Sequence, residues 1–195
     1  WQPGRRPEGL GLLPFLRGDG RYRPARSERL YHTRLGDAQF SRVRVSDEEQ
    51  GLAWDRSVIF LPSFPCWVIL DTVLATRAGL RTISALWWTT DILVQGQEWF
   101  KTYLRGIGEW RNRSDAALWI GMPGVPSQSD ALSFEPFRRH YQEEIALART
   151  WYGEQRPGRA VNFVSVLWPR PYHDPEDRHP ASIEVVESAP LGRGI

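Results

Sequence analysis

The chain has 195 residues, of which 41% are hydrophobic and 25% charged, so it can bury a globular core and is not a disordered chain. Its formal net charge is only +2, which gives no overall basic field of the kind that attracts nucleic acid or a membrane surface. No apolar run is long enough to predict a membrane span. The single cysteine, Cys66, excludes an internal disulfide.

Two residue types are used unusually. Arginine supplies nearly all of the positive charge, since Lys101 is the only lysine. Codon bias in a GC-rich genome accounts for most of these arginines, although guanidinium groups also bind carboxylates and sulfates bidentately. Ten tryptophans are present, and most should lie in the core, while an exposed indole can stack on a sugar ring. Because the chain starts at Trp1 and its only methionine is Met122, we expect it to be a piece of a longer protein.

In chain order, residues 1–26 are rich in glycine, proline and arginine, which predicts an irregular arm or linker. Short strands and turns follow, and the alternation of Val43 and Val45 with arginines indicates a strand with one wet face. The predicted domain covers residues 27–188, and 189–195 are a tail. Further strands are predicted at 54–61, 66–74, 80–90, 98–105, 116–121, 131–134, 161–168 and 182–187.

Two segments decide the fold class. Residues 161–168 are apolar on both faces, which predicts a central, doubly covered strand that ends at the prolines from Pro169 onward. Residues 137–151 contain good helix formers, but they also fit two strands joined at Glu143 and Glu144, which we favour because the neighbouring segments are strand-like. The sequence therefore predicts an all-β, mainly antiparallel, two-layer β-sandwich or supersandwich with at most one short helix.

The hairpin formed by 54–61 and 66–74 can be given a register. With its turn at 62–65, counting outward places Arg56 directly opposite Asp71 on a face that is otherwise apolar. A lone buried carboxylate would be costly, and opposed residues of opposite charge stabilise each other across strands. We therefore predict a structural ion pair between Arg56 and Asp71 that is mostly buried.

Three stretches of the sequence resemble the C-terminal β-sandwich of the heparinase II/III-like family of polysaccharide lyases. The first stretch is a strand with an aromatic-x-Arg motif, followed by a turn and a strand that reaches Asp. The second is a strand together with a later Tyr-Gly turn. The third is a late strand that ends in Leu-x-Pro. The three stretches are AWDRSVIFL with WVILDTV at 53–61 and 67–73, LWIG with TWYGE at 118–121 and 150–154, and VNFVSVLWP at 161–169. The resemblance covers roughly residues 27–169.

The resemblance implies an N-terminal α/α toroid ahead of this sandwich, with the active cleft between the two. The implied reaction is β-elimination on uronic-acid polysaccharides, in which a base removes the proton α to the sugar carboxylate while other groups neutralise that carboxylate. In the family these groups come mainly from the toroid. The family's opening strand of the sandwich, His-Asn-Thr-like and leading to Asp-Gly, is not found here. We therefore expect this chain alone to be inactive, its partners to be an acidic polysaccharide and the toroid, and its location to be periplasmic or secreted in a bacterium.

The candidate catalytic residues are His32 and its neighbour Tyr31, and Arg34 is the candidate for binding substrate. All three lie near the end of the sandwich expected to face the cleft, and a Tyr/His pair would suit β-elimination. Neighbouring residues on a strand point to opposite faces, however, so adjacency does not make a dyad. A half-buried structural histidine is the favoured alternative for His32.

A second cluster contains His173, Asp174 and His179, which are residue types that bind zinc or calcium. The prolines and mixed charges around them fit a solvated loop better, so no metal and no other cofactor is predicted. Two alternatives to the lyase interpretation stay open at this point: a non-catalytic carbohydrate-binding module, and a structural or protein-interaction sandwich.

Overall fold

The computed structural model describes residues 26–48, 50–103, 116–139, 142–171 and 185, and within them the regular structure is entirely β. The strands are β1 (Arg26–Leu35), β2 (Ala38–Asp47), β3 (Leu52–Leu61), β4 (Cys66–Ala75), β5 (Gly79–Thr89), β6 (Asp91–Gln95), β7 (Trp99–Tyr103), β8 (Ala116–Gly121), β9 (Asp130–Arg139), β10 (Gln142–Gln155) and β11 (Ala160–Pro171). None of the described residues belongs to a helix that could cross a membrane.

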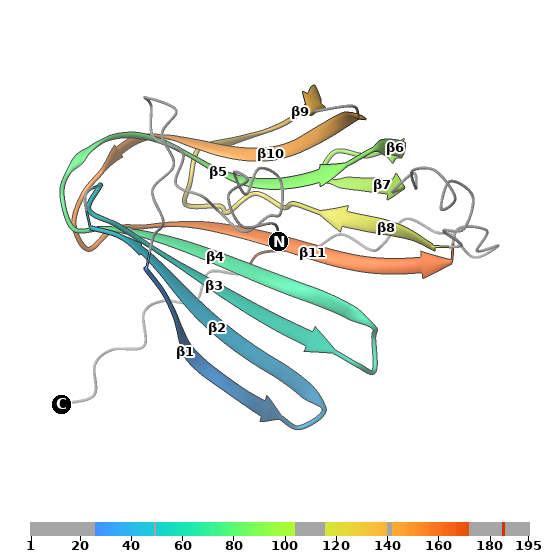
Figure 1. Ribbon diagram of the computed structural model, residues 1–195, viewed down its shortest axis with the longest axis horizontal. Coiled ribbons are helices and arrows are strands. Elements are labelled where there is room, and N and C mark those ends of the chain that lie inside the picture. Colours follow the sequence, from blue (N-terminus) through green and yellow to red (C-terminus); the bar gives the residue numbers. More distant parts are fainter. Residues whose placement is uncertain (1–25, 49, 104–115, 140–141, 172–184, 186–195) are drawn as a thin grey trace.

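The strands form two antiparallel sheets stacked in two layers (Figure 1). The large sheet has eight strands in the order β1-β2-β3-β4-β11-β8-β7-β6, and the small sheet has three in the order β5-β10-β9. The face of the large sheet that meets the small sheet is called the inner face below, and the opposite one the outer face. The predicted all-β, two-layer fold class is confirmed.

The main core lies between the two sheets because alternate residues of each strand turn their apolar side chains toward the other layer. Val73 and Phe163 from the large sheet and Ala85 and Leu147 from the small sheet are buried together there. Met122, which follows β8, is also fully buried in this cluster. The strands that contribute to this core therefore turn the side with these apolar residues toward the other layer.

The predicted central strand corresponds to β11, which lies between β4 and β8. It does not end before Pro169 as expected, since Pro169 and Pro171 continue the pairing with β8. The register with β4 ends at Leu167, so from Pro169 onward β11 pairs on one side only. A proline, which lacks an N–H donor, is tolerated where one side of a strand has no partner.

Residues 130–155 form the β9–β10 hairpin, as favoured over a helix. The last pair of its ladder is Arg139 with Gln142, so the hairpin closes before the predicted junction at Glu143 and Glu144. The short strand β6 was not predicted from the sequence. The expected arm at 1–26 lies, apart from Arg26, outside the described residues, as do the metal-loop residues and, apart from Val185, the strand at 182–187.

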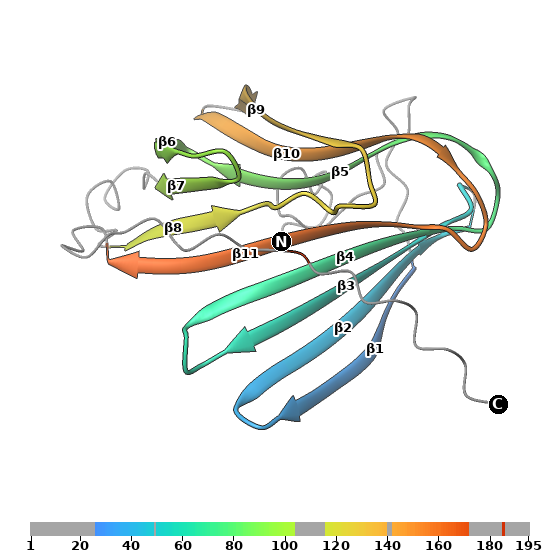
Figure 2. The same cartoon turned by 180° about the vertical axis from the view of Figure 1, so that it is seen from behind.

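The two sheets differ greatly in width. Figures 1 and 2 show β1, β2 and β3 fanning out beyond the three-stranded sheet, so the small sheet covers only part of the inner face. The small sheet therefore leaves an area of inner face uncovered next to the core, and the candidate residues that the structure describes, except Tyr31, lie in it or at its margin.

Candidate functional site

The pairing register arranges the inner-face side chains in rows across β1, β2, β3, β4 and β11, because directly opposed residues share a face. One row contains Arg29, Val43, Arg56, Asp71 and Phe163. The next contains His32, Ser41, Val58, Ile69 and Ser165. A third contains Arg34, Gln39, Phe60, Trp67 and Leu167.

Arg56 and Asp71 are directly opposed on β3 and β4 and form a bidentate ion pair. The Arg56 Nε and Nη2 groups donate to the two Asp71 carboxylate oxygens, each at 2.7 Å, and the Trp54 Nε1 group donates to Oδ1 at 2.9 Å. Asp71 is almost completely buried, and the Arg56 side chain is 14% exposed. The Asp71 carboxylate therefore joins β3 to β4 through its hydrogen bonds to Arg56 and Trp54.

This ion pair is also tied to the small sheet. The Arg56 guanidinium lies 5.5 Å from the centre of the Trp87 ring on β5, and the Trp87 Nε1 group donates to the Ser165 hydroxyl on β11 at 2.9 Å. Cation–π contacts of this kind are most favourable when partly desolvated. Trp87 therefore fixes the small sheet above β3 and β11 at the margin of the uncovered area.

Beyond this margin the inner face presents basic and aromatic side chains, here called the inner-face patch and consisting of Arg29, His32, Arg34, Phe60 and Trp67. The three β1 members are exposed, and Trp67 is 36% exposed. The Phe60 and Trp67 rings stack with their centres 5.0 Å apart, and the Arg34 Nε group donates to the Gly36 carbonyl at 3.1 Å. The patch combines guanidinium donors with an exposed indole.

Tyr31 is not part of this patch. It pairs with Arg42, and its ring meets Phe40 edge-on with the ring centres 5.8 Å apart on the outer face. His32 pairs with Ser41 on the inner face, so the two candidate catalytic side chains point to opposite sides of the sheet. The structure brings His32 and Arg34 together on one face and leaves Tyr31 on the other.

The outer face contains a second buried carboxylate that sequence reasoning did not single out. Asp55 on β3 is 1% exposed and accepts two hydrogen bonds from Arg44, at 2.6 and 2.7 Å, and a third from Arg42. Burial alone would raise the pKa of Asp55, but the hydrogen bonds from Arg44 and Arg42 and their positive charge outweigh it, so the pKa lies below its ordinary value. The bond to Asp55 also raises the pKa of Arg44.

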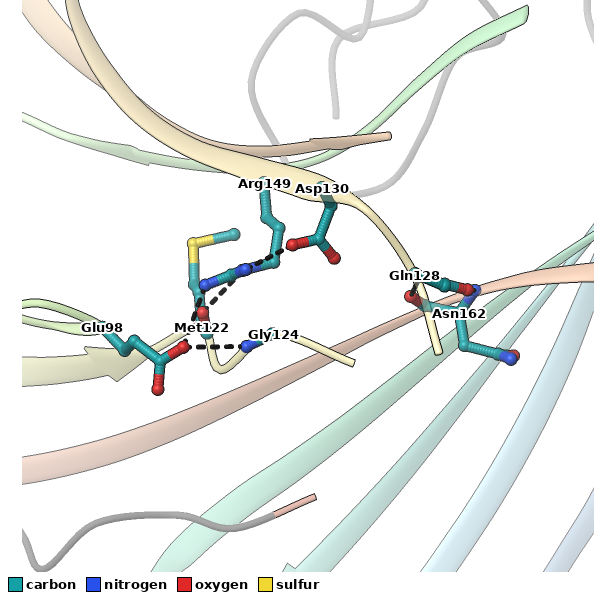
Figure 3. A network of polar contacts seen from close by, with 7 residues as sticks. All are labelled: Glu98, Met122, Gly124, Gln128, Asp130, Arg149 and Asn162. Carbon is teal, nitrogen blue, oxygen red and sulfur yellow. Dashed lines mark hydrogen bonds and ion pairs between the residues drawn. The ribbon is translucent and has the colours of Figure 1, made fainter. Parts of the chain in front are cut away.

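Figure 3 shows a third network, which ties the segment after β8 to both sheets. The Arg149 guanidinium on β10 is 7% exposed, donates to the Met122 carbonyl at 2.7 Å and pairs with the carboxylates of Asp130 and Glu98. Glu98 also accepts a hydrogen bond from the Gly124 N–H at 2.9 Å. Because its partners come from distant parts of the chain, no local sequence signal could have indicated this site.

The Gln128 side chain completes the attachment of that segment. It donates to the Asn162 carbonyl at 2.7 Å and accepts from the Asn162 N–H at 2.6 Å, an amide pairing that mimics a strand contact to β11 (Figure 3). These networks tie the crossing from the large to the small sheet to both layers, with the single guanidinium of Arg149 paired with two carboxylates.

Among the described residues, the buried carboxylates named above are held in ion pairs. Asp55, Asp71 and Asp130 are all engaged by arginines, and no cluster of metal-binding side chains occurs in the described ranges. A catalytic base needs hydrogen-bond reach to its proton together with groups that neutralise the developing charge. Among the described residues of the inner-face patch, the exposed His32 is the candidate base, and it lies on the same face as Arg29 and Arg34.

Comparison with known proteins identifies the fold but no sequence relative. No family model matches the sequence, and no curated protein matches it. Among solved structures, a crystal structure of heparinase III superposes with a TM-score of 0.53 at 8% identity, covering 73% of this chain and 21% of that one. A heparinase III gene product with methylated lysines gives 0.52 at 13% identity, covering 74% and 21%, and its unmodified form gives 0.50 at 15%, covering 74% and 22%.

These matches show a shared fold, since the identities are too low to show more. The chain spans only about a fifth of the length of the heparinase structures that it matches, at most 22% of the structures compared above. The matched part corresponds to an all-β region, as the described residues here are. The described chain thus has the fold of one region of the heparinase III structures.

Proposed function

We propose that this chain is the β-sandwich portion of a polysaccharide lyase related to the heparinases, which acts on glycans containing uronic acid by β-elimination. The observation that carries the proposal is the fold shared with solved heparinase III structures over about three quarters of this chain. The small share of those structures that it spans supports a further domain, an N-terminal α/α toroid, as the partner that completes the cleft. The chain alone would then be inactive.

The inner-face patch supports this proposal chemically. Guanidinium groups such as those of Arg29 and Arg34 bind planar carboxylates and sulfates through charge-assisted hydrogen bonds. The exposed Trp67 ring on β4, in the same row across the sheet as Arg34, offers an apolar surface for the C–H face of a sugar. The patch therefore suits the binding of an acidic glycan, whereas the base would come from the partner domain.

Titration calorimetry with the 195-residue chain tests this role. Oligosaccharides of heparan sulfate and alginate should bind at low ionic strength, while a neutral glucan of the same length should not. The double variant Arg29→Ala, Arg34→Ala should weaken binding by about tenfold or more, roughly 1.4 kcal/mol. The matched control is Arg159→Ala, because Arg159 is exposed in the β10–β11 turn away from the patch. Equal affinity for neutral and acidic glycans, or an equal loss in the control, would contradict the proposal.

The second candidate function is a non-catalytic carbohydrate-binding module. The observation that favours it concerns the described residues. They include exposed aromatic and basic side chains, but no neighbouring pair on one face that could act as catalytic acid and catalytic base. A Trp67→Ala variant separates the two: a binding module that relies on stacking should lose its affinity for both neutral and acidic sugars. In the lyase portion the loss should be confined to acidic glycans.

A further inference from the structure

The two sheets end in four edge strands, β1 and β6 in the large sheet and β5 and β9 in the small one. Edge strands present unpaired backbone groups, and proteins usually protect them with bulges, charges, prolines or short length. Here β1 has a bulge between Arg29 and Tyr31, and β6 has five residues and an irregular register. The third, β9, contains Pro136. Three of the four edges thus carry a recognisable protection.

The fourth edge, β5, has no bulge, no proline and no short length to protect it. It pairs with β10 over eleven residues without a shift in register, contains no proline, and has Arg81 as its only charged residue. Among the described strands, β10 is the only one hydrogen-bonded to it. A long, regular and apolar edge of this kind is a template for the addition of another strand.

The space beside β5 is lined by an apolar strip. Trp87 places β5 above Arg56 on β3, and the large sheet continues outward from there to β2 and β1 (Figures 1 and 2). On the inner face of β2 and β3 lie Val43, Val45 and Val58, of which Val43 is 37% exposed. A strand added to β5 would extend the small sheet over these valines and bury them.

We propose that an extended segment of a separate partner polypeptide adds to the edge of β5 that no described strand occupies, along residues 80–87, and completes the small sheet over β2 and β3. Its inward-facing residues would be apolar, to pack on Val43 and Val58. One carboxylate would meet Arg81, whose Nη2 group donates to the Gln50 carbonyl at 3.0 Å and whose buried Nε group has no hydrogen-bond partner. Backbone pairing with β5 supplies affinity, and the alternating side chains supply selectivity.

Other occupants fit this place less well. A glycan offers no ladder of alternating N–H and C=O groups to the β5 backbone, and it would leave the valine strip unburied. A second copy pairing antiparallel through β5 would bring its own large sheet into the layer already filled by β1, β2 and β3. The patch residues Arg29 and Arg34 are on β1, one strand beyond β2, so a strand placed over β2 and β3 is not placed over them, and this inference does not depend on the proposed function.

Hydrogen exchange of the 195-residue chain, measured by NMR, tests the proposal. The probe is a nine-residue synthetic peptide of alternating valine and threonine with a glutamate at each end, and the control peptide has proline at two central positions. In the free chain, alternate amides of β5 between residues 80 and 87 should exchange quickly, because they face away from β10. With the first peptide these amides should slow by about tenfold or more, while those of β1 and β9 should not change.

Two matched variants test the valine strip. Val43→Asp should weaken binding of the peptide by about tenfold, roughly 1.4 kcal/mol. Val94→Asp should leave it unchanged, because Val94 is an exposed valine, 45% against 37% for Val43, on the bulged β6 edge. Melting temperatures check that both variants fold, and the wild-type exchange measurement does not depend on them. Protection at β1 instead of β5, equal binding of the proline peptide, or protection of β5 by a heparan sulfate oligosaccharide would each overturn the proposal.

Discussion

Removal of the Arg56 side chain should destabilise the protein strongly. Asp71 is 1% exposed and accepts three hydrogen bonds, two of them from Arg56. In Arg56→Ala only the Trp54 bond would remain to a buried carboxylate. Breaking a buried ion pair from one side costs about 3–5 kcal/mol, because the remaining charge is left uncompensated. At about 2–4 °C per kcal/mol for a chain of this size, the melting temperature should fall by roughly 6–20 °C.

Removing the charge of Asp71 instead of the Arg56 side chain should lower the free energy of unfolding by less. Asp71→Asn keeps an acceptor for Trp54, and the Arg56 side chain, at 14% exposure, can reach water, so a loss of about 1.5–3 kcal/mol is expected. The double variant Arg56→Met, Asp71→Leu should be less destabilised than the sum of the single variants, since an apolar pair leaves no buried charge.

Urea unfolding followed by tryptophan fluorescence measures these free energies by linear extrapolation. The control is Arg156→Ala, which removes a 2.8 Å pair with Glu154 whose two side chains are 64% and 56% exposed, and which should change stability by about 0–1 kcal/mol. An Arg56→Ala variant that unfolds within about 1 kcal/mol of the wild type would refute the reasoning about burial.

Three further predictions concern other buried positions. The lowered pKa of Asp55 stabilises the fold above the ordinary aspartate value of 3.8, so the stability difference between wild type and Asp55→Asn, measured by urea unfolding, should shrink as the pH falls below that value. A Cβ at Gly121 would lie 2.7 Å from the Trp99 ring, so Gly121→Ala should cost about 1–3 kcal/mol in thermal unfolding, while Gly79→Ala, with no atom closer than 3.9 Å, should cost less than about 1. Burial raises the pKa of Cys66, so a thiol reagent should label it only as fast as the protein unfolds, and rapid labelling of the native protein would contradict its placement.

The features that sequence reasoning located are those encoded by neighbouring residues. The β3–β4 register followed from a turn at 62–65, and that turn places Arg56 opposite Asp71. The central position of β11 followed from apolar residues on both of its faces. Both arguments use only the period of two along a strand and the length of one turn.

The features that it missed depend on contacts between distant segments. Arg149 meets Glu98, Met122 and Asp130 only because β10 and the segment after β8 come together across the two sheets. Pro169 was expected to end a strand, and it does not because its position along β11 has a neighbour on one side only. Such outcomes are set by the order of strands in the sheets, which a single sequence does not reveal.

The inactivity of the chain alone is the central functional claim, and ultraviolet detection of unsaturated uronate tests it most directly. The 195-residue chain is incubated with heparan sulfate and with alginate, next to a His32→Ala variant and an active lyase as a positive control for the assay. Because His32 faces away from Tyr31, and the proposed toroid that would form the second wall of the cleft is not included in the assay, both forms of the chain should release no more product than the blank. Release by the wild type that disappears in His32→Ala would contradict the account and make the sandwich itself catalytic.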